Sequence, residues 1–314
     1  MSMVNTGKSN LQNRNKNISY MKKSYFKLNE DAPLFVLLSK KPLWWRKLID
    51  DSDLYCNIRK NNRINVYYRG ASIMSLSYKD GSIEADIHNY YLGYEKASCD
   101  LLNIKYGNVT LKPEEILCRI QTIKKRVEEN KKNLACIAGE EKNGKNYSSE
   151  KYVQSQMYLN DKLYIDTEFA LSLDDGTEIR IDLVKLSEEG MICFEELKLI
   201  DDSRLKPSGN KKAEILKQMD SYDKFLKEAA KIKGEKLQPI LVEYYSKVLR
   251  IMKKIGIART EIIPLSVCDY VYLSIEQTYT KKHQRRNSAI EVIQEVCKEL
   301  HSNIKDVVQK YESL

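Results

Sequence analysis

A short polar stretch, SEEG at 187–190, lies past the middle of the 314-residue chain. The acid Asp182 precedes it, and the acid Glu196 and the amine Lys198 follow it. A three-residue loop with Gly190 in the left-handed conformation would place Asp182 opposite Glu196 on neighbouring strands. Carboxylates this close raise each other's pKa unless a cation lies between them. A hard divalent ion such as Mg²⁺ is the simplest such cation, and a register slip of one residue would remove the pairing.

A β-hairpin is needed to bring these side chains together. Two β-rich apolar runs, 178–186 and 191–199, flank the sequence SEEG, and this pattern predicts two strands joined by a tight turn. Side chains alternate between the faces of a strand, so Glu196 and Lys198 share one face. The apolar neighbours of these charges favour a largely buried strand.

A solvated hairpin is the alternative interpretation of the same residues. Its charges would pair diagonally across the strands, Arg180 with Glu196 or Lys198 with Asp182.

A further acid precedes the hairpin. Ser148, Ser149 and Glu150 have the composition of a helix start, with serines at the cap and an acid in the first turn. Glu150, Val153 and Met157 follow the i, i+3, i+7 spacing of one helix face. We therefore expect a helix over 149–159 that turns Glu150 inward.

A second helix is predicted after the hairpin, over 211–230. Its apolar stripe contains Ile215, Met219, Tyr222 and Leu226. Gln218 and Tyr222 are four residues apart and lie on neighbouring turns of the same face.

These residues resemble the PD-(D/E)XK nuclease superfamily. Asp182 followed by Glu196-Leu197-Lys198 is similar to its D and E-x-K elements, and Gln218 with Tyr222 looks like the Q-x-x-x-Y motif of its RecB-like branch. The predicted order of helix 149–159, strands 163–173, 178–186 and 191–199, helix 211–230 and strand 239–245 resembles the superfamily's αβββαβ core. The resemblance is confined to the C-terminal part of the chain, and it implies an α/β core with a mixed central sheet flanked by helices. With the N-terminal lobe, the chain would be α+β overall.

The resemblance implies metal-dependent hydrolysis of phosphodiester bonds. Asp182, Glu196 and the backbone carbonyl of Leu197 would hold Mg²⁺ or Mn²⁺, and Glu150 would complete the shell directly or through water. Lys198 would orient the attacking water or neutralise developing charge. Gln218 and Tyr222 would brace the site or contact the substrate. We expect DNA rather than RNA as the substrate, with a role in genome defence or repair.

Two other functions are compatible with the sequence. The chain could bind nucleic acid without cutting it, or act as an adaptor subunit of a larger defence or repair assembly. The sequence is also compatible with a homodimer.

The charge balance suits a polyanionic partner. Lys and Arg number 53 against 44 Asp and Glu, a formal net charge of +9, although such an excess also occurs in proteins that touch no nucleic acid. The alternative interpretations are that Arg204 and Lys206 offset nearby acids, that the basic run at 281–286 is a solvated loop, and that the tyrosine-rich strand before Arg69 forms a small core. The candidate nucleic-acid contacts are Arg69, Arg204, Lys206, Lys281, Lys282, Arg285 and Arg286.

Composition along the chain predicts four regions: a basic disordered tail (1–20), an N-terminal α+β lobe (21–110), a linking helix and loop (111–147), and a nuclease-like domain (148–314). Short strands at 55–59, 63–69, 72–78 and 81–88 are expected in the lobe, with a hairpin turn at Asp80-Gly81. Further expectations are one helix from Pro113 to Val127, a strand at 269–275 and a helix at 288–311.

Other features narrow the class of protein. Seven cysteines without a C-x-x-C pair argue against a zinc site and a disulfide framework, and they favour a reducing cytoplasm. No run of 18 apolar residues occurs, so no membrane span is expected. Asp166 and Glu168, on the strand at 163–173, are expected to face solvent.

Overall fold

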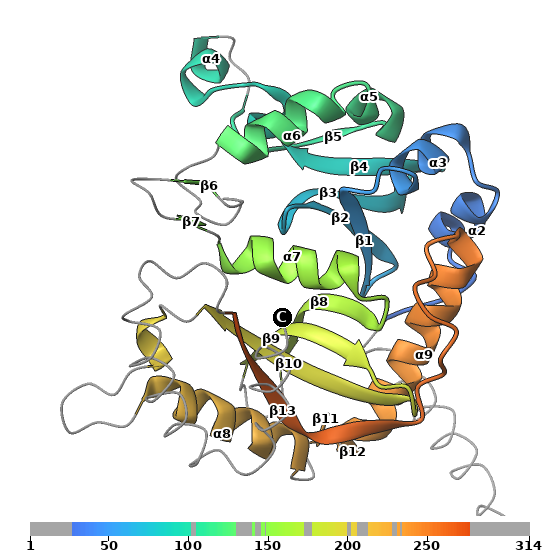
Figure 1. The fold of residues 1–314 in the computed structure, drawn as a ribbon. Helices are drawn as coiled ribbons and strands as arrows, with labels where there is room; N and C mark the ends of the chain where they lie inside the picture. The colour runs from blue at the N-terminus through green and yellow to red at the C-terminus, as the bar shows by residue number, and fades with distance from the viewer. Residues whose placement is uncertain are drawn as a thin grey trace, which may run out of the picture.

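The computed structural model describes residues 27–101, 105–129, 140–141, 146–147, 149–172, 178–199, 202–205, 213–227, 231–232 and 234–276. The predicted tail at 1–20 and helix at 288–311 lie outside these residues. The described part is a mixed α and β structure with two main sheets and several helices (Figure 1). None of its helices combines the length and apolar character needed to cross a bilayer.

The first sheet is an antiparallel meander in chain order, preceded by helices α2 (Pro33–Ser39) and α3 (Leu43–Ile49). Asp80 and Gly81 form the predicted turn, since Lys79 pairs with Ser82 around them. The last strand was not predicted. The strands are β1 (Leu54–Arg59), β2 (Arg63–Tyr68), β3 (Ala71–Lys79), β4 (Ser82–His88) and β5 (Asn108–Leu111), and η1 (Asn89–Leu92) and α4 (Lys96–Leu101) precede β5.

The single helix expected from Pro113 to Val127 is wrong. The chain forms α5 (Pro113–Leu117) and α6 (Ile120–Glu129) instead. The amide of Arg119 donates to the carbonyl of Ile116, three residues back, which tightens the chain between the two helices. Ile116 and Ile123 are both buried, so the apolar stripe continues across the break and conceals it in the sequence.

The second sheet has the strand order β13-β10-β9-β8. β8 (Tyr164–Ser172), β9 (Glu178–Leu186) and β10 (Met191–Leu199) are antiparallel, and β13 (Ser266–Glu276) runs parallel to β10. Helix α7 (Glu150–Asn160) precedes the sheet. The connection from β10 to β13 contains η3 (Ser203–Leu205), α8 (Glu214–Lys227), β11 (Lys231–Ile232), β12 (Glu235–Lys236) and α9 (Leu237–Ile255), and two short strands, β6 (Glu140–Glu141) and β7 (Asn146–Tyr147), precede α7.

The fourth strand expected at 239–245 is also wrong, because these residues belong to α9. The segment ILVEYY favours a strand by composition, yet a short apolar run does not by itself distinguish strand from helix. Buried residues recur at helical spacing well beyond it, at Leu241, Tyr245, Val248 and Met252. The place of the fourth strand is taken by β13, which contains the strand predicted at 269–275.

Helices cover both faces of the second sheet. On one face Tyr158 of α7 packs in a cluster with Tyr164 and Leu183. On the other, Phe194 of β10 contacts Phe225 of α8 at 6.4 Å between ring centroids. β10 is therefore buried on both sides, as the sequence predicted for the strand that contains Glu196 and Lys198, whereas the first half of β9 leaves one face exposed.

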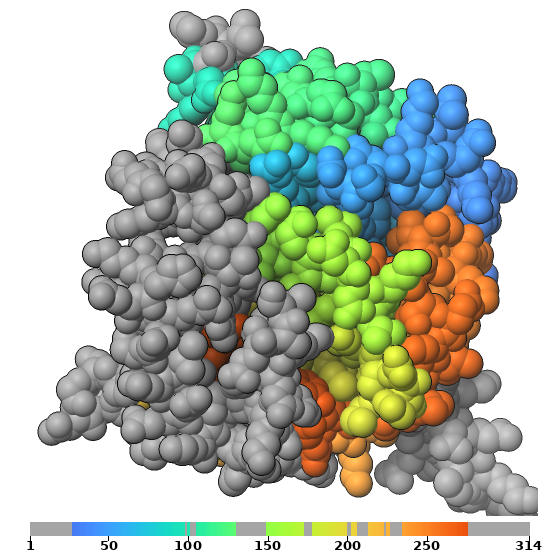
Figure 2. Space-filling model, in the orientation of Figure 1, coloured from blue at the N-terminus to red at the C-terminus, as the bar shows by residue number. Residues whose placement is uncertain are grey.

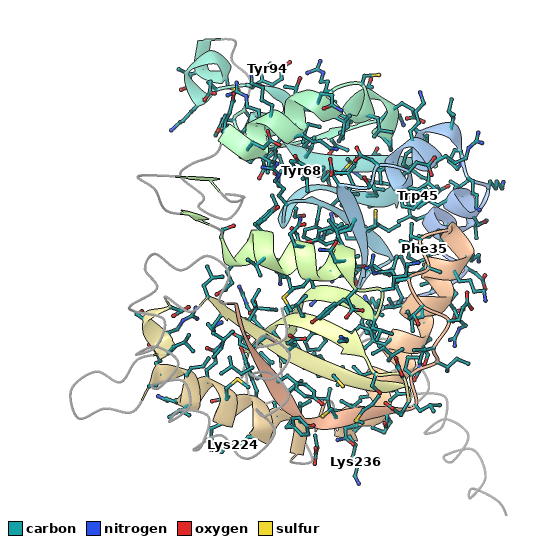
Figure 3. All side chains as sticks on the ribbon, viewed as in Figure 1. Phe35, Trp45, Tyr68, Tyr94, Lys224 and Lys236 are labelled. Carbon is teal, nitrogen blue, oxygen red and sulfur yellow. The ribbon has the colours of Figure 1, made fainter. Side chains whose placement is uncertain are left out.

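The two sheets share one apolar core. Trp45 of α3 donates from Nε1 to the carbonyl of Ile255, at the end of α9, over 2.8 Å. Figure 3 shows Phe35 and Trp45 where α2 and α3 meet α9. In the space-filling view α7, in light green, lies against the blue N-terminal elements (Figure 2).

A buried ion pair also joins the sheets. Arg59, at the end of β1, pairs with Asp166 on β8, whose side chain is 4% exposed. Asn57 and Thr167 form a hydrogen bond beside this pair, at 2.7 Å. The expectation that Asp166 faces solvent is therefore wrong, because β1 covers it and supplies its counter-ion. Glu168 is exposed, as expected.

Candidate active site

The β9–β10 hairpin has the register on which the predicted site depends. Gly190 adopts φ +82° and its amide donates to the carbonyl of Ser187 at 3.0 Å. Ser187 also donates from its amide to the carbonyl of Met191, at 2.8 Å, which closes a three-residue loop. The ladder ends with the pair of Glu195 and Leu183, and the next residues of the two strands are Glu196 and Asp182.

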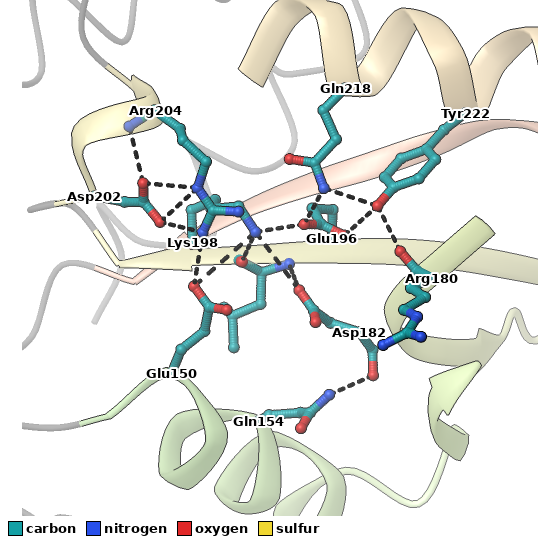
Figure 4. Close-up of polar contacts among 11 residues, drawn as sticks. Glu150, Gln154, Arg180, Asp182, Glu196, Lys198, Asp202, Arg204, Gln218 and Tyr222 are labelled. Atoms are coloured by element: carbon teal, nitrogen blue, oxygen red, sulfur yellow. Dashed lines mark hydrogen bonds and ion pairs between the residues drawn. The ribbon is translucent and has the colours of Figure 1, made fainter. Parts of the chain in front are cut away.

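Lys198 lies at the centre of the site, and its side chain is only 1% exposed (Figure 4). Its Nζ atom donates to Glu196 Oε1 and, at 2.7 Å, to the carbonyl of Leu197. Asp182 Oδ2 lies 3.8 Å from Nζ, and Glu150 Oε2 lies 4.0 Å from it. The pair between Lys198 and Asp182 therefore exists, but in a buried setting that rules out the solvated hairpin.

Asp182 is held by its neighbours on both sides. Its Oδ2 atom accepts from the amide of Leu197 at 2.9 Å. Its backbone carbonyl accepts from Gln154 Nε2 at 2.5 Å, across from α7. Gln154 is buried and was not identified from the sequence. Its position four residues after Glu150 on the inward helix face was the available signal.

Glu150 enters the site from the first turn of α7. Ser149 caps this helix, since its side chain accepts from the amide of Tyr152 at 3.2 Å. The capping fixes where the helix begins, and hence where Glu150 projects. The carboxylate is partly open to solvent, with the side chain 33% exposed.

Gln218 and Tyr222 reach Glu196 from α8. Gln218 Nε2 lies 2.7 Å from Glu196 Oε1 and 2.8 Å from the Tyr222 hydroxyl. That hydroxyl lies 2.5 Å from the carbonyl of Arg180 and 3.1 Å from Glu196 Oε2. Gln218 and Tyr222 therefore hold both carboxylate oxygens of Glu196. The Tyr222 hydroxyl also links this acid to the backbone of β9 at Arg180.

The three acids share an environment that disfavours their charged forms. Burial, with a contribution from Asp182, raises the pKa of Glu150 to about 7 despite the opposing charge of Lys198. Burial also raises the pKa of Asp182 and of Glu196, and for Glu196 the charge of Asp182 adds to the effect. Burial therefore outweighs the opposing charge of Lys198 at all three acids.

The donor set can be compared with the needs of a metal ion. No group of three or more His, Cys, Asp or Glu side chains in the described part of the chain is arranged as a metal-binding cluster. The oxygens of Glu150, Asp182, Glu196 and Leu197 do all lie within 4.0 Å of Lys198 Nζ. Three carboxylates and a carbonyl are oxygen donors of the kind that Mg²⁺ or Mn²⁺ prefers, so these residues could hold such an ion.

Of the candidate nucleic-acid contacts, Arg204 lies beside the site. Its Nη2 atom is 2.5 Å from Asp202 Oδ2 and 3.9 Å from Glu150 Oε2. Burial alone would raise the pKa of Asp202, but its hydrogen bonds with Arg204 outweigh this and lower it. Asp202 was not among the predicted site residues, although it is two residues from Arg204 in the same loop.

Arg69 lies in the turn between β2 and β3, where it pairs with Glu128 at 3.3 Å rather than with an acid of the site. The other candidate contacts, Lys206, Lys281, Lys282, Arg285 and Arg286, lie outside the described residues.

No family model, no curated protein and no solved structure matches this chain.

Proposed function

We propose that the protein is a metal-dependent nuclease that hydrolyses phosphodiester bonds, with DNA as the favoured substrate. The observation that carries the proposal is the convergence of Glu150, Asp182, Glu196 and the Leu197 carbonyl on one buried ammonium. Acids, a carbonyl and an amine in this arrangement serve phosphoryl chemistry, where a cation and a donor must both face the phosphate. The resemblance of these residues to the PD-(D/E)XK pattern supports the same proposal.

Each residue has a role in this proposal. Glu150, Asp182, Glu196 and the carbonyl of Leu197 hold Mg²⁺ or Mn²⁺. When bound, the ion lowers the pKa of a water molecule and offsets charge on the phosphate.

Lys198 donates a hydrogen bond to the attacking water or to a phosphate oxygen, where charge increases during the reaction. Its burial keeps this donor in one place. Gln218 and Tyr222 keep Glu196 oriented through the contacts described above.

Binding of the substrate would depend on the positive charge of arginines beside the site. Arg204 is 37% exposed and could turn from Asp202 and Glu150 towards a phosphate. Arg180 is 81% exposed, and its own carbonyl is held by Tyr222 at the site. Contacts of this kind are independent of base sequence, so we expect binding that weakens as salt increases.

The test is cleavage of linear, circular and single-stranded DNA and of RNA, each with Mg²⁺ and with EDTA. We expect Mg²⁺-dependent cleavage that Lys198→Met and Asp182→Asn abolish. Lys185→Met is the matched control, because Lys185 is a β9 lysine that pairs with Asp161 at 2.6 Å and makes no contact with the site acids. Full cleavage by Lys198→Met would refute the proposal. Metal-independent binding without any cleavage would favour the alternative of a nucleic-acid-binding or adaptor subunit.

A further inference from the structure

The turn between β2 and β3 contacts the backbone of α7 directly beside Glu150. Gly70, the second residue of this turn, is buried and has φ +79°. A β-carbon at Gly70 would lie 2.7 Å from the carbonyl carbon of Lys151 and closer still to its oxygen. Such distances are shorter than van der Waals contact, so any side chain here would push the first turn of α7 away. The glycine lets the N-terminal sheet touch the helix.

The turn itself is fixed in place. Arg69 pairs with Glu128 of α6 at 3.3 Å, and the Tyr68 hydroxyl donates to the same carboxylate at 2.5 Å. The Arg69 guanidinium also lies over the rings of Tyr68 and Tyr152, at 5.4 and 5.9 Å from their centroids. Tyr152 belongs to the first turn of α7, so the contact between turn and helix includes both backbone and side chain.

The same helix turn is held from the second sheet as well. Lys151 pairs with Glu168 of β8 at 3.0 Å, and Glu168 in turn accepts from the Tyr67 hydroxyl at 3.3 Å. Gln154 binds the carbonyl of Asp182. The start of α7 is therefore held between the two sheets, as its position in Figure 1 indicates.

We propose that the Arg69–Gly70 turn of the N-terminal sheet is a positioning element of the active site, which sets where Glu150 stands relative to Asp182 and Lys198. The inference rests on the proposed function, since it assigns the N-terminal lobe a part in building that site. It identifies Gly70 as a positioning residue that touches neither substrate nor ion. A displacement of the helix by about 1 Å in this position can cost about a hundredfold in rate.

The fold provides a matched control in Gly81. Gly70 and Gly81 are each the second residue of a two-residue hairpin loop in the same sheet, with φ +79° and +86°, and each follows a residue with φ near +50°. Alanine is therefore strained to a similar extent at both positions. Only Gly70 contacts α7, because no atom lies within 4 Å of a β-carbon at Gly81.

The experiment compares Gly70→Ala with Gly81→Ala in the full chain. We expect faster hydrogen exchange at the amides of α7 in Gly70→Ala alone. We also expect Mn²⁺ affinity, measured by calorimetry, to fall by about tenfold, as for other residues that orient a ligand. On DNA, kcat should fall by about a hundredfold with little change in KM. Equal exchange and equal Mn²⁺ affinity in the two variants would overturn the inference.

Two milder substitutions serve as the test if Gly70→Ala does not fold. Arg69→Met removes the contacts with Tyr152 and Glu128. Arg63→Met, at the other end of β2, removes an exposed pair with Asp86 of β4. Only Arg69→Met should increase exchange in α7 and weaken Mn²⁺ binding, and identical behaviour of the two would count against the inference. If the wild type cleaves nothing, the proposed function fails, while exchange and Mn²⁺ binding still decide whether the turn positions Glu150.

Discussion

The Nζ atom of Lys198 lies within 4.0 Å of three carboxylates, and no comparable charge from the described residues enters the same space except Arg204, 3.9 Å from Glu150. One ammonium cannot fully stabilise three negative charges in a buried setting. The pKa values of the three acids are raised, that of Glu150 to about 7. At neutral pH without a metal, this carboxyl group is therefore divided between its charged and neutral forms.

This pKa predicts how stability depends on pH. Between pH of about 4.5 and 7, folded Glu150 keeps a proton that the unfolded chain releases, so the free energy of unfolding falls as the pH rises and levels off above pH 7. Glu150→Gln cannot ionise and lacks this loss. Because the side chain is one-third exposed, we discount for solvent screening and expect the variant to be more stable than wild type by about 1–2 kcal/mol at pH 8.

Urea unfolding in EDTA at pH 4.5 and pH 8 measures the difference. Asp182 and Glu196 are present in both proteins, so their contributions largely cancel. A stability gap that is the same at both pH values would contradict the assignment of Glu150.

At the scale of elements, the arrangement of the site depends on one hairpin and two helices. The sequence predicted the hairpin with its register, because Gly190 requires a left-handed conformation and the apolar residues alternate around it. It also predicted that Glu150 would face inward and that Gln218 and Tyr222 would share one face of their helix. These are local patterns, each contained in one element or in two adjacent ones.

The sequence did not predict features that depend on contacts between distant parts of the chain. The segment 239–245 has the composition of a strand, and only its packing in α9 decides for a helix. Asp166 was expected in solvent because its partner, Arg59, belongs to a different sheet. The contact of Gly70 with Lys151 likewise leaves no periodic trace in the sequence.

The pair of Arg59 and Asp166 gives a prediction at this scale. Arg59→Met leaves a buried carboxylate without its cation, so we expect a loss of about 3–5 kcal/mol in the free energy of unfolding. Arg63→Met, which breaks an exposed pair with Asp86, should cost less than about 1 kcal/mol. Chemical denaturation of both variants checks this, and equal losses would show that the buried pair contributes no more than a surface one.

For the whole molecule, the shared core implies that the two sheets unfold together. Apolar residues of both sheets belong to one cluster, and Trp45 is hydrogen-bonded to the end of α9. The chain has two tryptophans, Trp44 and Trp45, both in α3, so their fluorescence reports on this junction. We expect unfolding followed by fluorescence and by far-ultraviolet circular dichroism to have the same midpoint. An earlier fluorescence transition would show that the N-terminal part separates first.

The amine at the centre of the acids also bears on how the protein matures. Where acidic ligands have only an ion to bring them together, the polypeptide cannot complete its native structure until that ion arrives. Here Lys198 brings a positive charge from the chain itself to the place where the acids meet. If the site binds Mg²⁺ as proposed, a newly made molecule would reach its final shape in a metal-poor environment and load the ion afterwards.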